Sequence, residues 1–467
     1  MKLNPFRKES LKRYLGTDKH FAKTLGAFDL LTIGIGAVIG TGIFILPGTV
    51  AAKEAGPGVT LSFLIAALVC TLASMCYAEL SSSIPVAGSA YSYGNILYGE
   101  VIGWILGWAL ILEYMLSVAA VSAGWASYFN SLLHSFRLHI PHHLEGPFDP
   151  LNGTYLNLWA VVSVLLIGIL LSRGMKASMK FNNAAVLIKI AIIFIFIGVG
   201  LFFIKPKNYQ PFTPYGTTGV LRGATTVFFA FLGFDVVSSS AAEVKNPKKN
   251  MPIGIIGTLI VAALLYMGVS AVLTGMVNYK QLDVANPVAY ALKLVNQGWV
   301  ADLLSIGAIV GMSTMMLTMI YSSSRLIYSI GRDGLLPSFL GKIDKHGLPE
   351  NSLWIVTIVI ALMGGLFSME ELTSLVSIGT LLAFTFVSFG VILLRRRKDI
   401  PEGDFKVPFY PVIPILSGLA CIGMMCFLSV KTYIFASIWF LFGLFIYCIY
   451  GYKHSKINKK MINYKKE

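Results

Sequence analysis

Residues 34–44 read GIGAVIGTGIF and lie inside the first long apolar segment of the chain, residues 29–51. Four glycines fall within nine residues of this stretch. A helix in lipid must satisfy every backbone polar group internally, and each glycine weakens a helix by up to about 1 kcal/mol relative to alanine. Two explanations remain open. The glycines form a face for close helix packing, or they interrupt the helix so that freed backbone groups can bind a ligand.

The composition predicts an all-α polytopic membrane protein. The chain has 467 residues, of which 56% are hydrophobic and only 13% charged, whereas soluble domains carry about 25% charged residues. A membrane-spanning helix needs about 20 consecutive, mostly apolar residues. Twelve such spans are predicted, with approximate limits 29–51, 59–81, 101–130, 155–172, 182–204, 220–242, 253–277, 299–328, 353–368, 371–394, 409–429 and 432–451.

Positive charge is distributed unevenly between the two sides of these spans. If the N-terminus is cytoplasmic, 28 of the 37 Lys and Arg residues lie on the cytoplasmic side and 8 on the other. The positive-inside rule therefore predicts that both termini are cytoplasmic. The net charge of +15 is explained by orientation and by attraction to anionic membrane lipids, so no nucleic-acid partner is expected.

The sixth span resembles the first in its pattern. Residues 226–235 read TVFFAFLGFD, and small polar residues follow. Thr41 and Phe231 are 190 residues apart, and five spans start at each of these points. Interrupted spans at corresponding positions of two halves indicate an inverted-repeat transporter with its binding site at mid-membrane.

A pair of interrupted helices offers two kinds of backbone group. Free N–H groups at a helix start suit a carboxylate, and free carbonyl oxygens suit an ammonium group. A free α-amino acid carries both groups, so it is the predicted ligand. Phe228, Phe229 and Phe231 flank the second interruption. They either close over the substrate or serve only in packing.

Two ionisable residues lie deep within predicted spans. Lys189 is surrounded by apolar residues in the fifth span, where a lysine costs about 2.5–3.5 kcal/mol on insertion scales. Because buried lysines can release a proton near neutral pH, Lys189 is the candidate proton carrier; the alternative is permanent donation to carbonyls. Glu113 in the third span either pairs with a cationic substrate or accepts a structural hydrogen bond.

These motifs together resemble the amino acid–polyamine–organocation (APC) superfamily, and within it the bacterial branch of the cationic amino acid transporter family. The resemblance covers about residues 20–455 and rests on residues 34–44, 228–235, 243–247, 324–326 and 332–337. It implies a LeuT/APC-type fold, a five-plus-five inverted repeat with twelve transmembrane helices in which helices 1 and 6 are interrupted. The expected parts are a cytoplasmic segment 1–28, two five-helix repeats at 29–204 and 220–394, helices 11 and 12 at 409–451, and a cytoplasmic tail 452–467.

The resemblance also implies roles for individual residues. The substrate carboxylate is expected on the backbone around Thr41 and Gly42, and Lys189 is expected to be the proton-coupling site. The amino group is expected at carbonyls near Val38, Ile39, Phe228 and Ala230, with Phe229 and Phe231 as the gate. The full expected substrate-binding set is Val38, Ile39, Gly40, Thr41, Gly42, Ile43, Phe228, Phe229, Ala230, Phe231 and Met319.

Two features depart from the family pattern or limit the substrate. Relatives commonly carry two acids before Val-x-Asn-Pro, but the first position here is Ala242, so gating is expected to differ. Met319 is bulky and falls where the family lines the side-chain pocket. Small or neutral amino acids are therefore favoured, without excluding cationic ones.

The leading prediction is proton–amino acid symport in the cell membrane by alternating access. The alternatives are uncoupled amino acid exchange and a non-transporting amino acid sensor. No nucleophile–base pair, phosphate-binding loop or metal-ligand spacing is present, so no enzyme activity, cofactor or metal is expected. His134, His139, His142 and His143 cluster in one outer loop without fixed ligand spacing. Protons and lipids are the other expected partners, and the resemblance leaves room for a small single-span membrane subunit.

Overall fold

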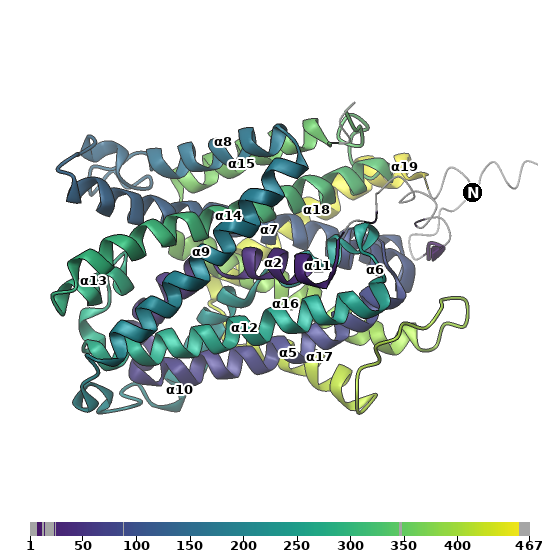
Figure 1. Cartoon of the computed structure of the whole chain (residues 1–467). Helices are drawn as coiled ribbons and strands as arrows, with labels where there is room; N and C mark the ends of the chain where they lie inside the picture. The colour runs from purple at the N-terminus through teal and green to yellow at the C-terminus, as the bar shows by residue number, and fades with distance from the viewer. Residues whose placement is uncertain are drawn as a thin grey trace, which may run out of the picture.

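A bundle of long helices forms the protein (Figure 1). The computed structural model describes residues 7–11, 14, 23, 25–86, 88–344 and 348–456. Within this part the chain forms no β-strand, only isolated bridges at Leu25–Val244 and Asp149–Thr154. The all-helical prediction therefore holds for the described residues.

The helices follow the apolar segments of the sequence. In chain order they are α2 (Ala27–Val38), α3 (Thr41–Phe44), α4 (Leu46–Val50), α5 (Val59–Ser83), α6 (Ser89–Leu97), α7 (Glu100–Ser135), α8 (Leu158–Ser172), α9 (Met175–Leu201), α10 (Gly216–Phe228), α11 (Val236–Ser239), α12 (Pro247–Met276), α13 (Pro287–Leu294), α14 (Gly298–Arg332), α15 (Glu350–Leu366), α16 (Met369–Leu394), α17 (Val412–Met425), α18 (Val430–Ile446) and α19 (Tyr452–His454). Short 3₁₀ or π segments include η2 (Ala51–Ala55), η6 (Phe229–Phe231), η7 (Ala241–Glu243) and η9 (Tyr447–Gly451).

Local capping explains where several of these helices begin. Ser368 and Glu371 form a reciprocal capping box at the start of α16, which satisfies two backbone N–H groups that have no intrahelical partner. The side chains of Asn157 and Ser429 each accept a backbone N–H at the starts of α8 and α18. The membrane helices are thus defined by apolar length and, at these ends, by a polar cap.

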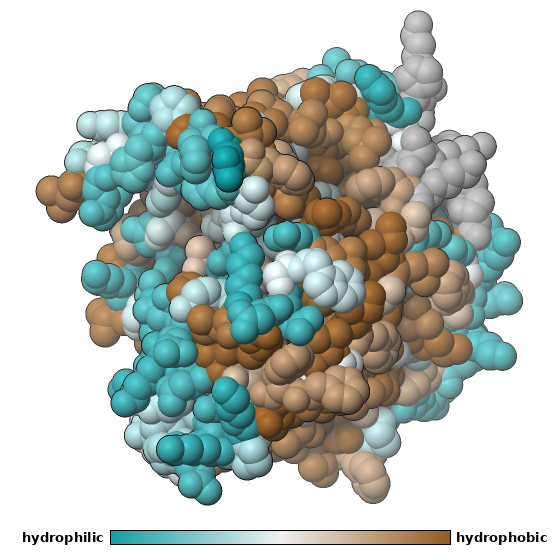
Figure 2. Space-filling view, turned by 60° about the vertical axis from the view of Figure 1, so that its left-hand side comes forward, coloured by the Kyte–Doolittle hydropathy of each residue, from teal (hydrophilic) through white to brown (hydrophobic). Residues whose placement is uncertain are grey.

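Eight helical segments of the described chain are long and apolar enough to cross a membrane. Four shorter apolar helices accompany them, namely Ala27–Val38, Leu158–Ser172, Glu350–Leu366 and Val412–Met425. Figure 2 shows brown, hydrophobic residues over much of one face, with teal, hydrophilic residues toward its left and right edges. This is the architecture of a multi-pass membrane protein. The count of twelve spans and the inverted repeat remain predictions.

The two interrupted segments lie inside the bundle. Helices α2 and α11 run through its middle, with α9, α12, α14 and α16 around them (Figure 1). The two longest helices of the described chain, α7 and α14, are mostly buried and pack against each other. In contrast, α18 belongs to the peripheral segment Val430–His454, and only 22% of the most apolar part of this segment is buried. The centre of the bundle therefore holds the backbone that departs from regular helix.

Both described ends of the chain meet at one end of the bundle. The Tyr14 hydroxyl donates to the Asp333 carboxylate over 3.2 Å, and the Lys456 amide donates to the Asp333 carbonyl over 3.0 Å. Asp333 directly follows α14. The N-terminal segment and the C-terminal end are therefore both attached to the end of the same central helix.

Candidate functional site at two interrupted helices

The first interruption separates α2 from α3. Helix α2 ends at Val38, and Ile39 is extended, with φ −82° and ψ 93°. Gly40 follows with φ −126° and ψ −130°, and helical geometry resumes at Thr41. Of the two explanations for the glycine run, an interrupted helix describes the backbone found here, although some of the glycines also permit close contacts.

The second interruption follows α10. The chain passes through the 3₁₀ turn η6, becomes extended at Leu232 and reaches a φ of +110° at Gly233 before α11 begins. This φ favours glycine because other residues are strained there. A Cβ added at Gly233 would also lie 2.9 Å from the Ala37 carbonyl oxygen and 2.9 Å from Met319 Cε. Gly233 therefore lets the second interruption pack against the first and against α14.

The two interruptions touch each other directly. A Cβ added at Gly42 would lie 2.5 Å from the Ala230 Cβ and 2.7 Å from the Ala230 Cα. Gly40 packs in the same way against the thioether sulfur of Met315. Every predicted substrate-binding residue is buried. The structure thus brings together the residues that the sequence assigned to two spans about 190 positions apart.

A tyrosine hydroxyl bridges the two interruptions. Tyr266 of α12 is fully buried, and its hydroxyl lies 2.9 Å from the Val38 carbonyl oxygen and 2.7 Å from that of Ala230. Its ring packs against Phe231 and Phe63, with centroids 5.0 and 5.5 Å away. Sequence reasoning missed Tyr266, because a single tyrosine in an apolar span carries no motif. Only the tertiary structure brings it to these carbonyls.

Lys189 of α9 reaches the first interruption. Its ammonium nitrogen lies 2.8 Å from the Ile39 carbonyl oxygen and 3.3 Å from those of Ile35, Gly36 and Gly311. A lysine ammonium has three N–H donors, so these four carbonyls fully occupy it. Because Gly311 belongs to α14, Lys189 connects α9, the interrupted helix and α14 through one nitrogen.

The predicted aromatic gate is divided between two packing groups. Phe231 lies against Tyr266 and against Phe63, whose centroid is 6.3 Å away. Phe228 instead contacts Phe384 of α16, with centroids 5.9 Å apart. Phe229 is buried between them in the chain. Phe231 is thus the predicted gate residue that stands beside the bridged carbonyls.

An acidic group lies behind the second interruption. The Asp235 carboxylate accepts a hydrogen bond of 2.6 Å from the Tyr114 hydroxyl, while its second oxygen has no partner among the described residues. Glu113 precedes Tyr114 in the chain. Both of its carboxylate oxygens are buried and have no hydrogen-bond partner among the described residues. Sequence reasoning singled out Glu113 but treated Asp235 only as the end of a motif.

One end of the interrupted helices is closed by backbone pairing and an ion pair. Leu25, just before α2, exchanges backbone hydrogen bonds with Glu243 and Lys245. The Glu243 carboxylate pairs with Arg325 of α14, whose guanidinium lies 4.5 Å from the centroid of the Tyr321 ring. Ala242, which replaces the first acid of the family pattern, leaves this ion pair intact. The departure therefore does not remove the acid that pairs across this end.

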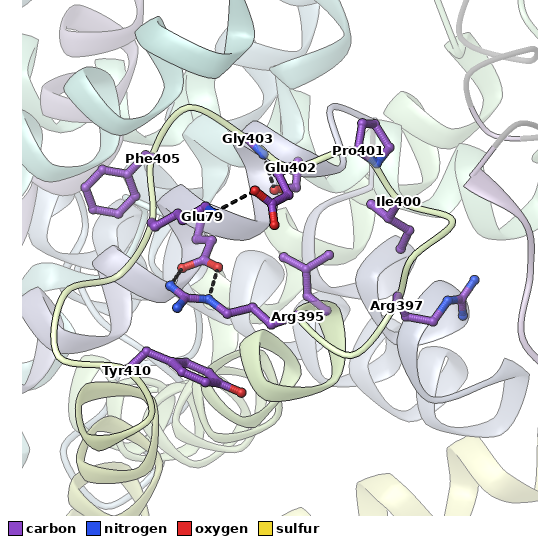
Figure 3. A pocket seen from close by; sticks show the side chains of 12 residues that line it. Glu79, Arg395, Arg397, Ile400, Pro401, Glu402, Gly403, Phe405 and Tyr410 are labelled. Carbon is purple, nitrogen blue, oxygen red and sulfur yellow. Dashed lines mark hydrogen bonds and ion pairs between the residues drawn. The ribbon is translucent and has the colours of Figure 1, made fainter.

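One cavity lies away from the interruptions. It holds about 320 Å³ and is lined by residues at the end of α5 and in the α16–α17 connection (Figure 3). On one side, Arg395 bonds both carboxylate oxygens of Glu79 over 2.7 and 2.8 Å. None of the predicted site residues lines it. We interpret the Glu79–Arg395 pair as a structural clamp between α5 and α16.

Two histidines near the connection between α7 and α8 contact one acid. His134 and His142 lie 3.5 and 3.4 Å from the two carboxylate oxygens of Glu145. The pKa of the exposed His142 is raised by two hydrogen bonds, first the one with the Asn152 carbonyl and then the one with the Glu145 side chain. The part of the chain that the structure describes contains no group of His, Cys, Asp and Glu arranged to hold a metal ion.

Comparison with known proteins identifies the class of this chain. The model of the amino acid permease family matches residues 25–464. The chain therefore belongs to the amino acid permease family of the APC superfamily, a family of transporters, and the resemblance found in its sequence is confirmed.

Individual relatives carry more specific names. The chain is 48% identical to a methylthioribose transporter of Bacillus subtilis, over 97% of this chain and 99% of that one. It is 45% identical to the branched-chain amino acid permease BcaP of the same organism, over 98% of this chain and 100% of that one. It is 40% identical to the chloroplastic cationic amino acid transporter 9 of Arabidopsis thaliana, over 81% of this chain and 68% of that one. These names span more than one substrate class.

Proposed function

We propose that this protein is a secondary active transporter that takes up free amino acids across the cell membrane by proton-coupled symport and alternating access. The observation that carries the proposal is the contact between the two interruptions, where the carbonyl oxygens of Val38 and Ala230 converge on one hydroxyl. Converging carbonyls suit the ammonium group of an amino acid. The branched-chain permeases among the relatives support the same substrate class.

The carboxylate end of the proposed site lies at Thr41 and Gly42. The first N–H groups of a helical segment have no intrahelical partner, and the Thr41 hydroxyl is buried with no hydrogen-bond partner among the described residues. An amino acid carboxylate placed here would accept from these donors while its ammonium group reaches the carbonyls. The zwitterion thus matches both halves of the site.

Lys189 is the proposed proton carrier. Its ammonium group holds together Ile39 of the first interruption and Gly311 of α14. Loss of the proton removes the charge from this contact and one of its three N–H donors, which weakens the attachment of the interrupted helix to α14. Proton release at Lys189 would therefore favour the movement that opens the site. Uncoupled exchange remains the alternative mechanism.

Met319 sets the proposed substrate size. Its side chain is fully buried and its methyl group lies close to Gly233, at the second interruption. A bulky thioether in this position leaves little depth for a long side chain, which favours small or neutral amino acids. The methylthioribose transporter among the relatives names a second candidate substrate. Methylthioribose carries hydroxyls but neither an ammonium nor a carboxylate group, so it would bring no charged group to the proposed contacts.

The remaining architecture is part of the same proposal. Two five-helix halves, residues 29–204 and 220–394, would move relative to each other around the site. Residues 409–451 would form the last two helices, and both termini would be cytoplasmic, because positive charge is concentrated on that side. The Leu25 pairing and the Glu243–Arg325 ion pair would then close the cytoplasmic end of the pathway.

Uptake into proteoliposomes tests the proposal. Purified protein is reconstituted, and accumulation of labelled amino acids and of methylthioribose is measured with and without an imposed pH gradient. We expect the gradient to drive accumulation of a small or neutral amino acid. Lys189→Met is expected to abolish accumulation while retaining exchange against internal unlabelled substrate, since it removes the proton site but no predicted substrate contact.

The same experiment separates the alternatives. Uptake that ignores the gradient in both wild type and Lys189→Met would show an exchanger in which Lys189 is structural. Transport of methylthioribose without any amino acid would overturn the substrate assignment. Lys280→Met, at an exposed lysine, is the matched control and should behave like wild type.

A further inference from the structure

The hydroxyl of Tyr266 occupies the two carbonyls that the proposed substrate needs. It lies 2.9 Å from the Val38 oxygen and 2.7 Å from the Ala230 oxygen. Val38 also accepts the Gly40 amide over 3.1 Å. For the Ala230 oxygen, Tyr266 is the one donor found in the described part of the chain.

One hydroxyl cannot satisfy two carbonyls equally. A tyrosine O–H has a single hydrogen, which these two oxygens must share. An ammonium group offers three charged N–H donors, and hydrogen bonds to charged groups are roughly twice as strong as neutral ones. At this pair of oxygens, an ammonium group is therefore a better donor than the tyrosine.

The tyrosine ring is held in place by its neighbours. The rings of Phe231 and Phe63 contact the Tyr266 ring at centroid distances of 5.0 and 5.5 Å. Tyr266, a residue of α12, is fully buried. The hydroxyl therefore points at the two interruptions because of packing, independent of the hydrogen bonds it makes. Removal of the oxygen alone should leave the ring where it is.

We propose that Tyr266 is a positioning residue whose hydroxyl competes with the substrate ammonium group for the Val38 and Ala230 carbonyls. This inference rests on the proposed function and adds a specificity-determining residue to it. The hydroxyl bonds the first interruption to the second, and the incoming ammonium group must take over both oxygens. The analogue of the amino acid that lacks the amino group has no donor at this position, so it cannot replace the hydroxyl at these oxygens.

Ligand binding to the purified protein tests this competition. Apparent dissociation constants are measured by ligand-induced thermal stabilisation for the transported amino acid and for its analogue that lacks the amino group. In Tyr266→Phe, the amino acid no longer displaces a hydrogen bond. Its affinity should rise about fivefold, the change expected from one net hydrogen bond. The affinity for the analogue should not change.

Tyr128→Phe is the matched control. The Tyr128 hydroxyl donates over 2.9 Å to the Phe44 carbonyl of the same interrupted helix, away from the bridged pair. This variant loses a comparable hydrogen bond and should leave both affinities unchanged. A rise in amino acid affinity in both variants would mean that general loosening, rather than competition, is the cause, and would overturn the inference.

Replacement of Tyr266 by 3-fluorotyrosine provides a second variant that keeps the ring and the hydroxyl. Fluorine makes the hydroxyl a stronger donor, so amino acid affinity should fall. Weaker or unchanged amino acid binding in Tyr266→Phe, or unchanged binding with 3-fluorotyrosine, contradicts the competition while leaving the proposed function standing. If wild type binds no amino acid at all, the proposed function and this inference both fail.

Discussion

The two interruptions differ in how their buried polar groups are paired. At the first, the carbonyls of Ile35, Gly36 and Ile39 all lie within 3.3 Å of the Lys189 ammonium group. At the second, the acids dominate. Asp235 has one hydroxyl donor, and Glu113 has no hydrogen-bond partner among the described residues. The buried ammonium group of Lys189 is thus surrounded by hydrogen-bond acceptors, whereas the buried carboxylate of Glu113 has no donor among the described residues.

This difference distinguishes a buried charged residue that stabilises the fold from one that does not. Removing one partner of a satisfied buried contact costs the full desolvation of the groups left behind, whereas a group without partners has no such contact to lose. Lys189 should therefore contribute to stability, and Glu113 should not. The sequence leaves two roles open for Glu113, a structural hydrogen bond and pairing with a cationic substrate, and its carboxylate accepts no hydrogen bond within the described part of the chain.

The largest expected effect is at Lys189. Lys189→Met removes the charged donor that contacts Ile39 and three other buried carbonyls, and hydrogen bonds to charged groups are worth about 1.5–3 kcal/mol. We expect the free energy of unfolding to fall by about 3 kcal/mol. Unfolding can be followed with a thiol-reactive dye, because Cys70, Cys76 and Cys421 are buried in the folded protein.

Lys280→Met serves again as the control for that measurement, since Lys280 is exposed. Equal unfolding curves for the two variants would contradict the comparison. They would show that the Lys189 contacts contribute no more to stability than an exposed lysine does.

A medium effect is expected where the two interruptions touch. In Gly42→Ala, the new methyl group would lie 2.5 Å from the Ala230 Cβ, and overpacking of this kind costs about 1–3 kcal/mol. Amino acid binding should also be lost, because the two interruptions are forced apart. Gly198→Ala is the matched control, since a Cβ there meets nothing within 4 Å. Wild-type binding by Gly42→Ala would show that the contact is not needed.

The smallest effect is expected at Glu113. Glu113→Gln should change the free energy of unfolding by less than about 1 kcal/mol, because it breaks no observed hydrogen bond. The contrasting variant is Glu79→Gln, which weakens the paired contact with Arg395. It should melt at a clearly lower temperature than Glu113→Gln. A lower melting temperature for Glu113→Gln than for Glu79→Gln would contradict the interpretation that Glu113 has no structural role.

The sequence predicted the fold class and the two unusual segments well. Long apolar runs predicted helices, and residues 34–44 and 226–235 contain the two places where the backbone leaves the helix. Lys189 was found because a lysine among apolar residues in a span is costly. Each of these signals is local, so each could be read along the chain.

The partners of these residues could not be predicted in the same way. Tyr266 is one of 21 tyrosines and carries no motif, yet its hydroxyl bridges the two interruptions. The proximity of Asp235 to Tyr114 joins positions 121 residues apart. No periodicity or spacing encodes such contacts, because they depend on how separate helices pack.

By itself, the sequence determined that this chain is a helical membrane protein of the amino acid permease family, with two interrupted segments and a buried lysine. The reason is that lipid requires long apolar helices, and departures from that requirement are visible residue by residue. The tertiary structure alone decided which groups those departures meet. Packing of α9, α12 and α14 around the interruptions assigns Lys189 to four carbonyls and Tyr266 to two, since hydrogen bonds between helices form only once the helices are side by side.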